Sequence, residues 1–170
     1  MNSAIFIGFI LLALVLPAIF YWLYFSTVEK RSRKIIQAYV SNSSQTFTNL
    51  SVWFKNVDVF KKKNRFALDP FDTLYAFNKC DFILNDRYAL MIGKAKFLGR
   101  QTLLMPTVLQ FDRSAATFQS MHVKVERIYD IDNDLAIEFS DAKYQNRITL
   151  VIKRADSGLK EAIKGRGVAL

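Results

Sequence analysis

Residues that build catalytic and metal centres are scarce in this chain, which has one cysteine, one histidine and six glycines. A lone cysteine, Cys80, cannot form an internal disulfide, and this agrees with a domain that faces the cytoplasm. Because His122 is the only histidine, neither a multi-histidine metal site nor a conventional catalytic dyad has supporting context. The sequence also lacks a glycine-rich phosphate loop, a nucleophile elbow and a kinase signature. We therefore expect a protein that is not an enzyme and that uses no catalytic residue, metal or cofactor.

Charged side chains are absent from the 22 residues between Ala4 and Phe25. A helix of this length reaches about 33 Å at roughly 1.5 Å per residue, which is enough to cross a hydrocarbon core of roughly 30 Å. Aromatic rings such as Tyr21 and Trp22 gather at its far end, where amphipathic rings favour the headgroup layer. Pro17 removes one backbone donor, a defect that transmembrane helices tolerate. The sequence therefore predicts a membrane anchor over residues 1–25.

A cleaved signal peptide is the alternative to this anchor, but only Asn2 and Ser3 precede the apolar run, which leaves no basic n-region. Lysine and arginine are retained on the cytoplasmic side of a membrane, and a basic cluster follows the anchor directly. We expect a single-pass protein with its N-terminus outside and its C-terminal domain in the cytoplasm. The sequons at residues 42–44 and 49–51 are then chance matches, and glycosylation of either would contradict this topology.

Acidic residues are few beside basic ones, with 15 Asp and Glu against 24 Lys and Arg, a net charge of +9. Anionic headgroups attract juxtamembrane basic residues by roughly 1 kcal/mol each. Two interpretations stay open: the clusters set topology and solubility, or they dock on anionic lipid. Nucleic acid is not an expected partner, since no recognition-helix, zinc or aromatic RNA-binding signature accompanies the charges. The candidate contacts with anionic lipid are Lys30, Arg31, Arg33, Lys34, Lys61, Lys62, Lys63, Arg65, Lys94, Lys96 and Arg100.

The chain after the anchor divides into a basic juxtamembrane helix and linker (26–70), a β domain (71–164) and a tail (165–170). An apolar stripe extends the helix to about Val40, and a polar linker follows. Residues 47–60 fit a helical face and a strand equally well. A turn at Asp69–Asp72 is expected to open the β domain.

Short apolar alternations predict antiparallel strands from there onward. We expect residues 80–84 and 88–93 to form a hairpin, with Cys80 on the apolar face as a small hydrophobe. A basic loop, Lys94 to Arg100, leads to a strand within 103–111, and the strands resume at Val123 after His122, which we expect at a strand entry.

The cleanest alternation follows in two later segments. Leu135, Ile137 and Phe139 face one side in the first, and Ile148, Leu150 and Ile152 repeat the pattern in the second. Asp156 or Ser157 is then expected to cap a short C-terminal helix.

An acidic run at residues 130–134, Asp-Ile-Asp-Asn-Asp, resembles the start of a calcium loop. An EF-hand requires glycine at its sixth position and usually glutamate at its twelfth, where this chain has Leu135 and Asp141. The flanking alternation favours a hairpin turn over a calcium site.

The six or so strands and the closing helix, between about Leu74 and Lys164, resemble a bacterial pleckstrin-homology-like (PH-like) β-barrel or sandwich. The predicted fold class is thus mainly β with flanking helices, and the resemblance implies a membrane-associated domain. We expect a non-enzymatic module that docks a protein partner near anionic lipid, by strand addition or helix docking. The alternatives are a lipid or apolar-ligand carrier and a membrane-bound enzyme without a recognisable motif. The expected carrier lining includes Phe82, Leu90, Ile92, Leu103 and Phe139.

Overall fold

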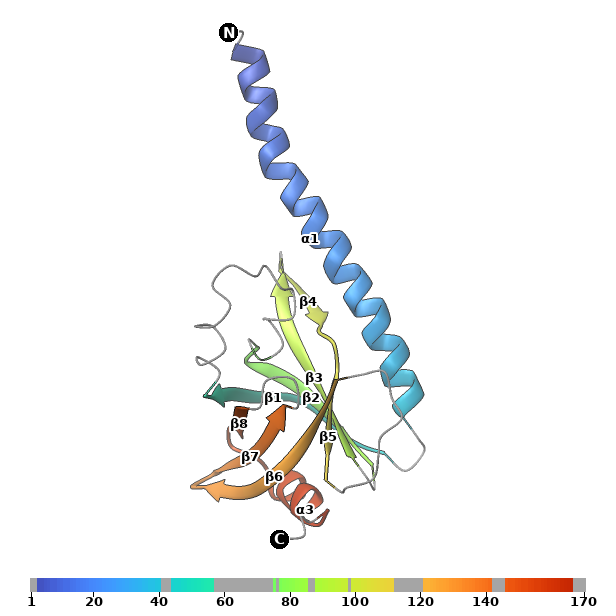
Figure 1. Ribbon diagram of the computed structural model, residues 1–170, viewed down its shortest axis with the longest axis vertical. Helices are drawn as coiled ribbons and strands as arrows, with labels where there is room; N and C mark the ends of the chain where they lie inside the picture. Colours follow the sequence, from blue (N-terminus) through green and yellow to red (C-terminus); the bar gives the residue numbers. More distant parts are fainter. Residues whose placement is uncertain are drawn as a thin grey trace.

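The computed structural model describes residues 3–40, 44–56, 75, 77–85, 88–97, 99–111, 121–141 and 146–166. Its elements are α1 (Ser3–Tyr39), β1 (Gln45–Lys55), β2 (Lys79–Leu84), β3 (Tyr88–Phe97), β4 (Arg100–Leu103), β5 (Thr107–Gln110), β6 (Met121–Ile131), β7 (Asp134–Asp141), β8 (Asn146–Ile152) and α3 (Ser157–Lys164). Figure 1 shows a long helix that passes along one side of a β-barrel, with the chain ends at opposite poles. The predicted turn at Asp69–Asp72 and the basic run Lys61–Arg65 lie outside the described residues.

The strands form one sheet in the order β2-β1-β8-β7-β6-β5-β3-β4, and a further pairing of β2 with β3 closes it. The strands β5 and β4 pair with successive parts of β3, at Tyr88–Met91 and Lys94–Phe97. A mainly β fold with an N-terminal helix and a short C-terminal helix is therefore confirmed. The architecture is compatible with a PH-like fold.

The clearest alternation in the sequence produces the core of the barrel. The pairs Leu135–Ile152 and Ile137–Leu150 join β7 to β8, and all four of these side chains are fully buried. The predicted hairpin of β2 and β3 is also confirmed, with Cys80 buried opposite Gly93. The core is thus built from inward-facing residues of nearly every strand.

Three features differ from the sequence-based expectations. First, β1 belongs to the sheet through Val52–Ile152 pairing, so the sheet begins before residue 71. Second, Lys94–Arg100 is largely the hairpin of β3 and β4 rather than a loop, because the lysines flank an inward-facing Ala95. Third, β5 and β6 pair in parallel rather than antiparallel, with Leu109 opposite Val123, because no tight turn joins these two strands in the sequence.

The acidic run at residues 130–134 forms the tight β6–β7 hairpin that was expected there, as the pairing of Ile131 with Asp134 shows. Asp134 accepts the Arg154 backbone N–H at 2.8 Å, and Asp130 forms ion pairs with Lys160 and Lys164 of α3. The hydrogen bond and ion pair with Lys164, followed by the charge of Lys160, lower the pKa of Asp130. These two carboxylates therefore link the β6–β7 hairpin to the segment that follows β8 and to α3.

The helix α3 caps one end of the barrel as predicted. Asp156 is its N-cap and accepts the Leu159 backbone N–H at 2.7 Å. Leu159 and Ile163, one turn apart, are fully buried in the main core. The helix is short, so its stability comes from this cap and the two core contacts.

The helix α1 is continuous through Pro17, and its C-terminal part packs on the outer face of the barrel. Tyr39 contacts Tyr88 with ring centroids 5.0 Å apart, and Ile35 and Ile36 pack against the same apolar cluster. The N-terminal part stands clear of every strand (Figure 1). Among the side chains that the structure describes, which in α1 are Ala13 and those from Val15 onward, no helix has a run long and apolar enough to cross a membrane.

Candidate membrane-facing surface

An exposed apolar surface lies on α1 between Val15 and Leu23, within the part of the helix that projects from the barrel. Its large side chains are each between 48% and 69% exposed. They are Val15, Leu16, Ile19, Phe20, Tyr21, Trp22 and Leu23. A contiguous apolar surface of this kind marks a contact with a protein or a membrane, because its exposure to water is unfavourable.

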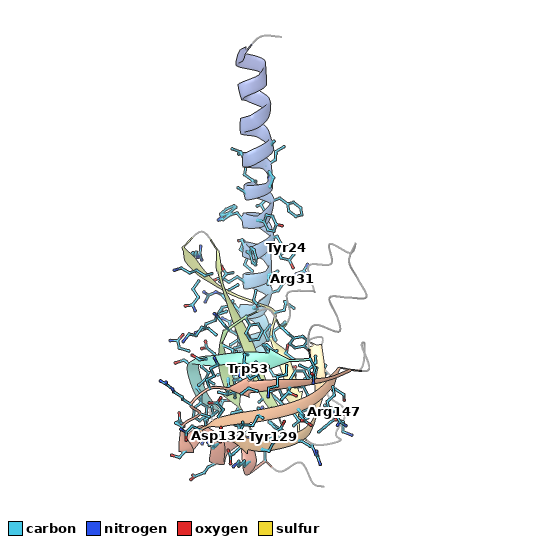
Figure 2. The ribbon with its side chains drawn as sticks, turned by 90° about the vertical axis from the view of Figure 1, so that its left-hand side faces the viewer. Tyr24, Arg31, Trp53, Tyr129, Asp132 and Arg147 are labelled. Carbon is cyan, nitrogen blue, oxygen red and sulfur yellow. The ribbon has the colours of Figure 1, made fainter. Side chains whose placement is uncertain are left out.

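Aromatic rings and then basic side chains follow this surface along the helix. Tyr24 and Phe25 meet edge to face at 5.5 Å, and Figure 2 shows Tyr24 above Arg31, beside the top of the barrel. The cations predicted for this segment, Lys30, Arg31, Arg33 and Lys34, are all exposed. The order apolar, aromatic, basic is the one that favours a bilayer interface.

The barrel is fixed to α1 directly below these rings. The Ser32 hydroxyl is fully buried and donates to the Leu104 carbonyl at 2.7 Å. Glu29 accepts from Arg33 at 2.7 Å on its own helix and lies 3.5 Å from the Arg100 guanidinium of β4. Phe25 packs against the barrel core. The barrel therefore has a fixed position relative to the apolar part of α1.

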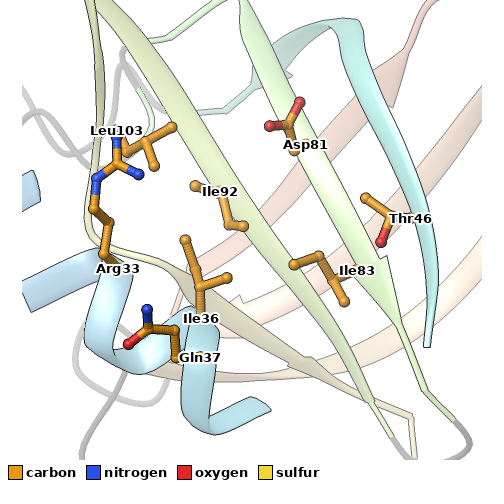
Figure 3. A pocket seen from close by; sticks show the side chains of 8 residues that line it. All are labelled: Arg33, Ile36, Gln37, Thr46, Asp81, Ile83, Ile92 and Leu103. Atoms are coloured by element: carbon orange, nitrogen blue, oxygen red, sulfur yellow. The ribbon is translucent and has the colours of Figure 1, made fainter. Parts of the chain in front are cut away.

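A cleft of about 280 Å³ lies between α1 and the outer face of β2, β3 and β4. Figure 3 shows Ile36 of α1 pointing toward Ile92 of β3, with Arg33 and Asp81 on opposite sides. Asp81 accepts the Asn49 backbone N–H at 2.8 Å and pairs with Lys94 at 2.6 Å. The hydrogen bond to Asp81 fixes Asn49 at a bulge of β1, where the φ angle of Asn49 is 58°.

A second pocket, of about 410 Å³, is lined by three lysines, one of which is Lys94. We call it the lysine pocket. Its lining residues are Asn78, Lys79, Lys94, Ala95, Lys96, Gly99 and Gln101. The Lys79 ammonium donates to the neutral Ser51 hydroxyl at 3.0 Å, and Lys96 is exposed. Because only Lys94 has a carboxylate beside it among the described residues, the pocket has excess positive charge.

The structure separates the predicted lipid contacts into two places. Lys94 and Lys96 line the lysine pocket, whereas Arg100 points to Glu29 of α1. The candidate lipid contacts listed from the sequence did not include Lys79, Asn78 or Gln101. Lys79 pairs with Lys94 across the β2–β3 hairpin, so the strand register brings it beside the predicted lysines.

A different face of the barrel carries two exposed aromatic residues. Trp53 of β1, Val151 of β8, Ala136 of β7 and Tyr129 of β6 are consecutive cross-strand partners. Figure 2 shows Trp53 and Tyr129 on one face, with Arg147. The Lys55 ammonium lies 4.9 Å from the centroid of the Trp53 ring. Tryptophan, tyrosine and arginine are the residues most enriched in protein–protein hot spots.

The residues with catalytic chemistry lie in structural positions. Burial, with a smaller contribution from Asp81, raises the pKa of Cys80 to about 12, so the thiolate is disfavoured at neutral pH. His122 is at the beginning of β6, as expected. The described residues hold no group of three or more His, Cys, Asp and Glu side chains that could bind a metal.

The expected carrier lining divides between two clusters. Phe82 and Phe139 are in the barrel core, whereas Leu90, Ile92 and Leu103 belong to the cluster beneath α1. These five residues therefore do not enclose one common cavity.

Comparisons with protein-family models, with curated proteins and with solved structures found no match to this chain.

Proposed function

We propose that this protein is a single-pass membrane protein whose α1 helix holds a PH-like, non-enzymatic barrel against the cytoplasmic face of an anionic bilayer, where the barrel docks a protein partner. One observation carries the proposal: a continuous helix leads from an exposed apolar surface, through aromatic and basic turns, into a buried contact with the barrel. The uncharged run Ala4 to Phe25 is long enough to span the hydrocarbon core.

The proposed orientation rests on charge. Lys30, Arg31, Arg33 and Lys34 follow the apolar run directly. Such residues are retained on the cytoplasmic side, which favours a cytoplasmic barrel. Each also gains roughly 1 kcal/mol beside anionic headgroups.

Partner docking is supported by the face that carries Trp53 and Tyr129, because neither α1 nor α3 covers it (Figure 2). Large aromatic rings left partly exposed on a rigid sheet provide contact area at low entropic cost. A protein partner is therefore proposed to bind here, on the exposed rings of Trp53 and Tyr129, since Val151 and Ala136 between them are buried.

Alkaline carbonate extraction of membranes from cells that express the full chain tests the anchor. We expect the protein in the membrane pellet. The double substitution Val15→Arg and Leu16→Arg costs about 5 to 7 kcal/mol of insertion free energy, since each arginine near the helix centre costs about 2.5 to 3.5 kcal/mol. This variant should move to the supernatant, whereas Gln37→Arg with Ala38→Arg, which adds the same charge beyond the apolar run, should not. Wild-type protein in the supernatant would contradict the proposal.

A further inference from the structure

The lysine pocket lies at the end of the barrel nearest the apolar part of α1. Figure 1 shows β3 and β4 reaching farther toward that part of the helix than the other strands. Gly99, with a φ of 79°, turns the chain between them and lines the pocket. The ion contact of Arg100 with Glu29 fixes this hairpin beside the last turns before the basic segment of α1.

The chemistry of the pocket suits a phosphate group. Lys79, Lys94 and Lys96 provide ammonium groups from two neighbouring strands, and Asn78 and Gln101 add amide donors. Asp81 offsets one charge, that of Lys94, which leaves the excess on Lys79 and Lys96. Ammonium groups bind phosphate as point charges, and the amide groups of Asn78 and Gln101 can donate hydrogen bonds to its oxygens.

We propose that the lysine pocket binds the phosphate of an anionic phospholipid headgroup, with Lys79 and Lys96 as the main charge contacts. The inference rests on the proposed membrane attachment, because α1 places the pocket at the bilayer surface. A general basic surface would spread the headgroup contacts over many side chains, whereas this proposal assigns the phosphate to the lysine pocket alone. Lys30 and Lys34 on α1 are not part of this pocket.

The test uses the full chain in neutral maltoside micelles, with dioctanoyl phosphatidylglycerol as the probe. Acetylation of lysines by an impermeant reagent, measured by mass spectrometry, reports which ammonium groups the probe covers. We expect protection of Lys79 and Lys96 and none of Lys124, an exposed lysine on β6. Lys96→Gln should raise the half-protecting probe concentration at Lys79 about fivefold, the value of one headgroup–lysine contact. The matched control Lys124→Gln should leave that concentration within about twofold, since its side chain is outside the pocket.

Three results would overturn the headgroup site. They are equal protection of Lys124, an unchanged midpoint in Lys96→Gln, and equal protection by inorganic phosphate at the same concentration, which would make the ligand a soluble phosphate. Because micelles contain no bilayer, failure of the membrane anchor would show in carbonate extraction and not here. The two proposals can therefore fail separately.

Discussion

Replacement of Gly93 by alanine should destabilise the closed barrel. Gly93 lies on β3 opposite Cys80 of β2, at the pairing that closes the sheet. A Cβ atom at this position would lie 2.4 Å from Cδ1 and 2.5 Å from Cε1 of Phe77. Such contacts are far inside van der Waals distance, so the ring or the strand must move.

The Phe77 ring has little freedom to move away. It is buried, and it meets Phe54 edge to face at 5.0 Å. Forcing one extra carbon into a packed core costs about 1 to 3 kcal/mol. For a protein of this size, 1 kcal/mol lowers the melting temperature by about 2 to 4 °C, so we expect a loss of about 2 to 12 °C.

Thermal unfolding of the full chain in neutral micelles, followed by circular dichroism, measures this loss. The control Gly158→Ala adds the same methyl group within α3, where the nearest heavy atom is 3.4 Å away. It should stabilise the protein by about 0.5 to 1 kcal/mol, because alanine favours a helix over glycine. Adding Phe77→Leu to Gly93→Ala should cost less than the sum of the two single changes. A Gly93→Ala protein as stable as wild type would refute the close packing of Phe77 on this seam.

Three further changes test the helix contacts and the buried thiol. Ser32→Ala should cost about 1 to 3 kcal/mol of unfolding free energy, because the buried Leu104 carbonyl loses its donor; urea unfolding in micelles measures this, and an unchanged midpoint would contradict the contact. Asp156→Ala should cost about 1 kcal/mol through the lost N-cap, with Asp156→Asn retaining most of it in the same assay. The Cys80 thiol stays protonated to about pH 12 in the folded chain but ionises near 9.0 when unfolded, so its contribution to stability is complete below pH 9 and is lost as the pH rises toward 12. The loss of unfolding free energy between pH 9 and pH 12 should therefore be smaller in Cys80→Ala than in wild type. Identical pH profiles of the two proteins would contradict the raised pKa of Cys80.

The parts of the fold that the sequence predicted are those where one face is buried and the other is polar. The alternation of Leu135, Ile137 and Phe139 in β7 follows this rule, and the N-cap at Asp156 was predictable because it depends on local hydrogen bonding. The strand β1 was ambiguous, because its first half is largely exposed and a bulge at Asn49 interrupts its period. Alternation cannot reveal this shift, which depends on the tertiary contact with Asp81.

The site was predicted less completely than the core. The basic residues of α1 were found because charge next to an apolar run is a local signal. The lysines of the first hairpins lie close together in the sequence, but the polar lining by Asn78 and Gln101 required the strand register, and the buried Ser32 contact required knowledge of where α1 packs. A polar residue within a basic helix gives no sign in sequence that a distant carbonyl accepts its hydrogen bond.

The most direct test of the account is the sidedness of the barrel in native membranes. Cys80 is fully buried and its raised pKa disfavours the thiolate, so in a Cys80→Ala background Lys153→Cys provides a single thiol at an exposed position. A membrane-impermeant maleimide should label this cysteine in inverted vesicles, and in right-side-out vesicles only after permeabilisation. Labelling from outside intact vesicles, or recovery of the protein free of membranes, would contradict a barrel held at the cytoplasmic face.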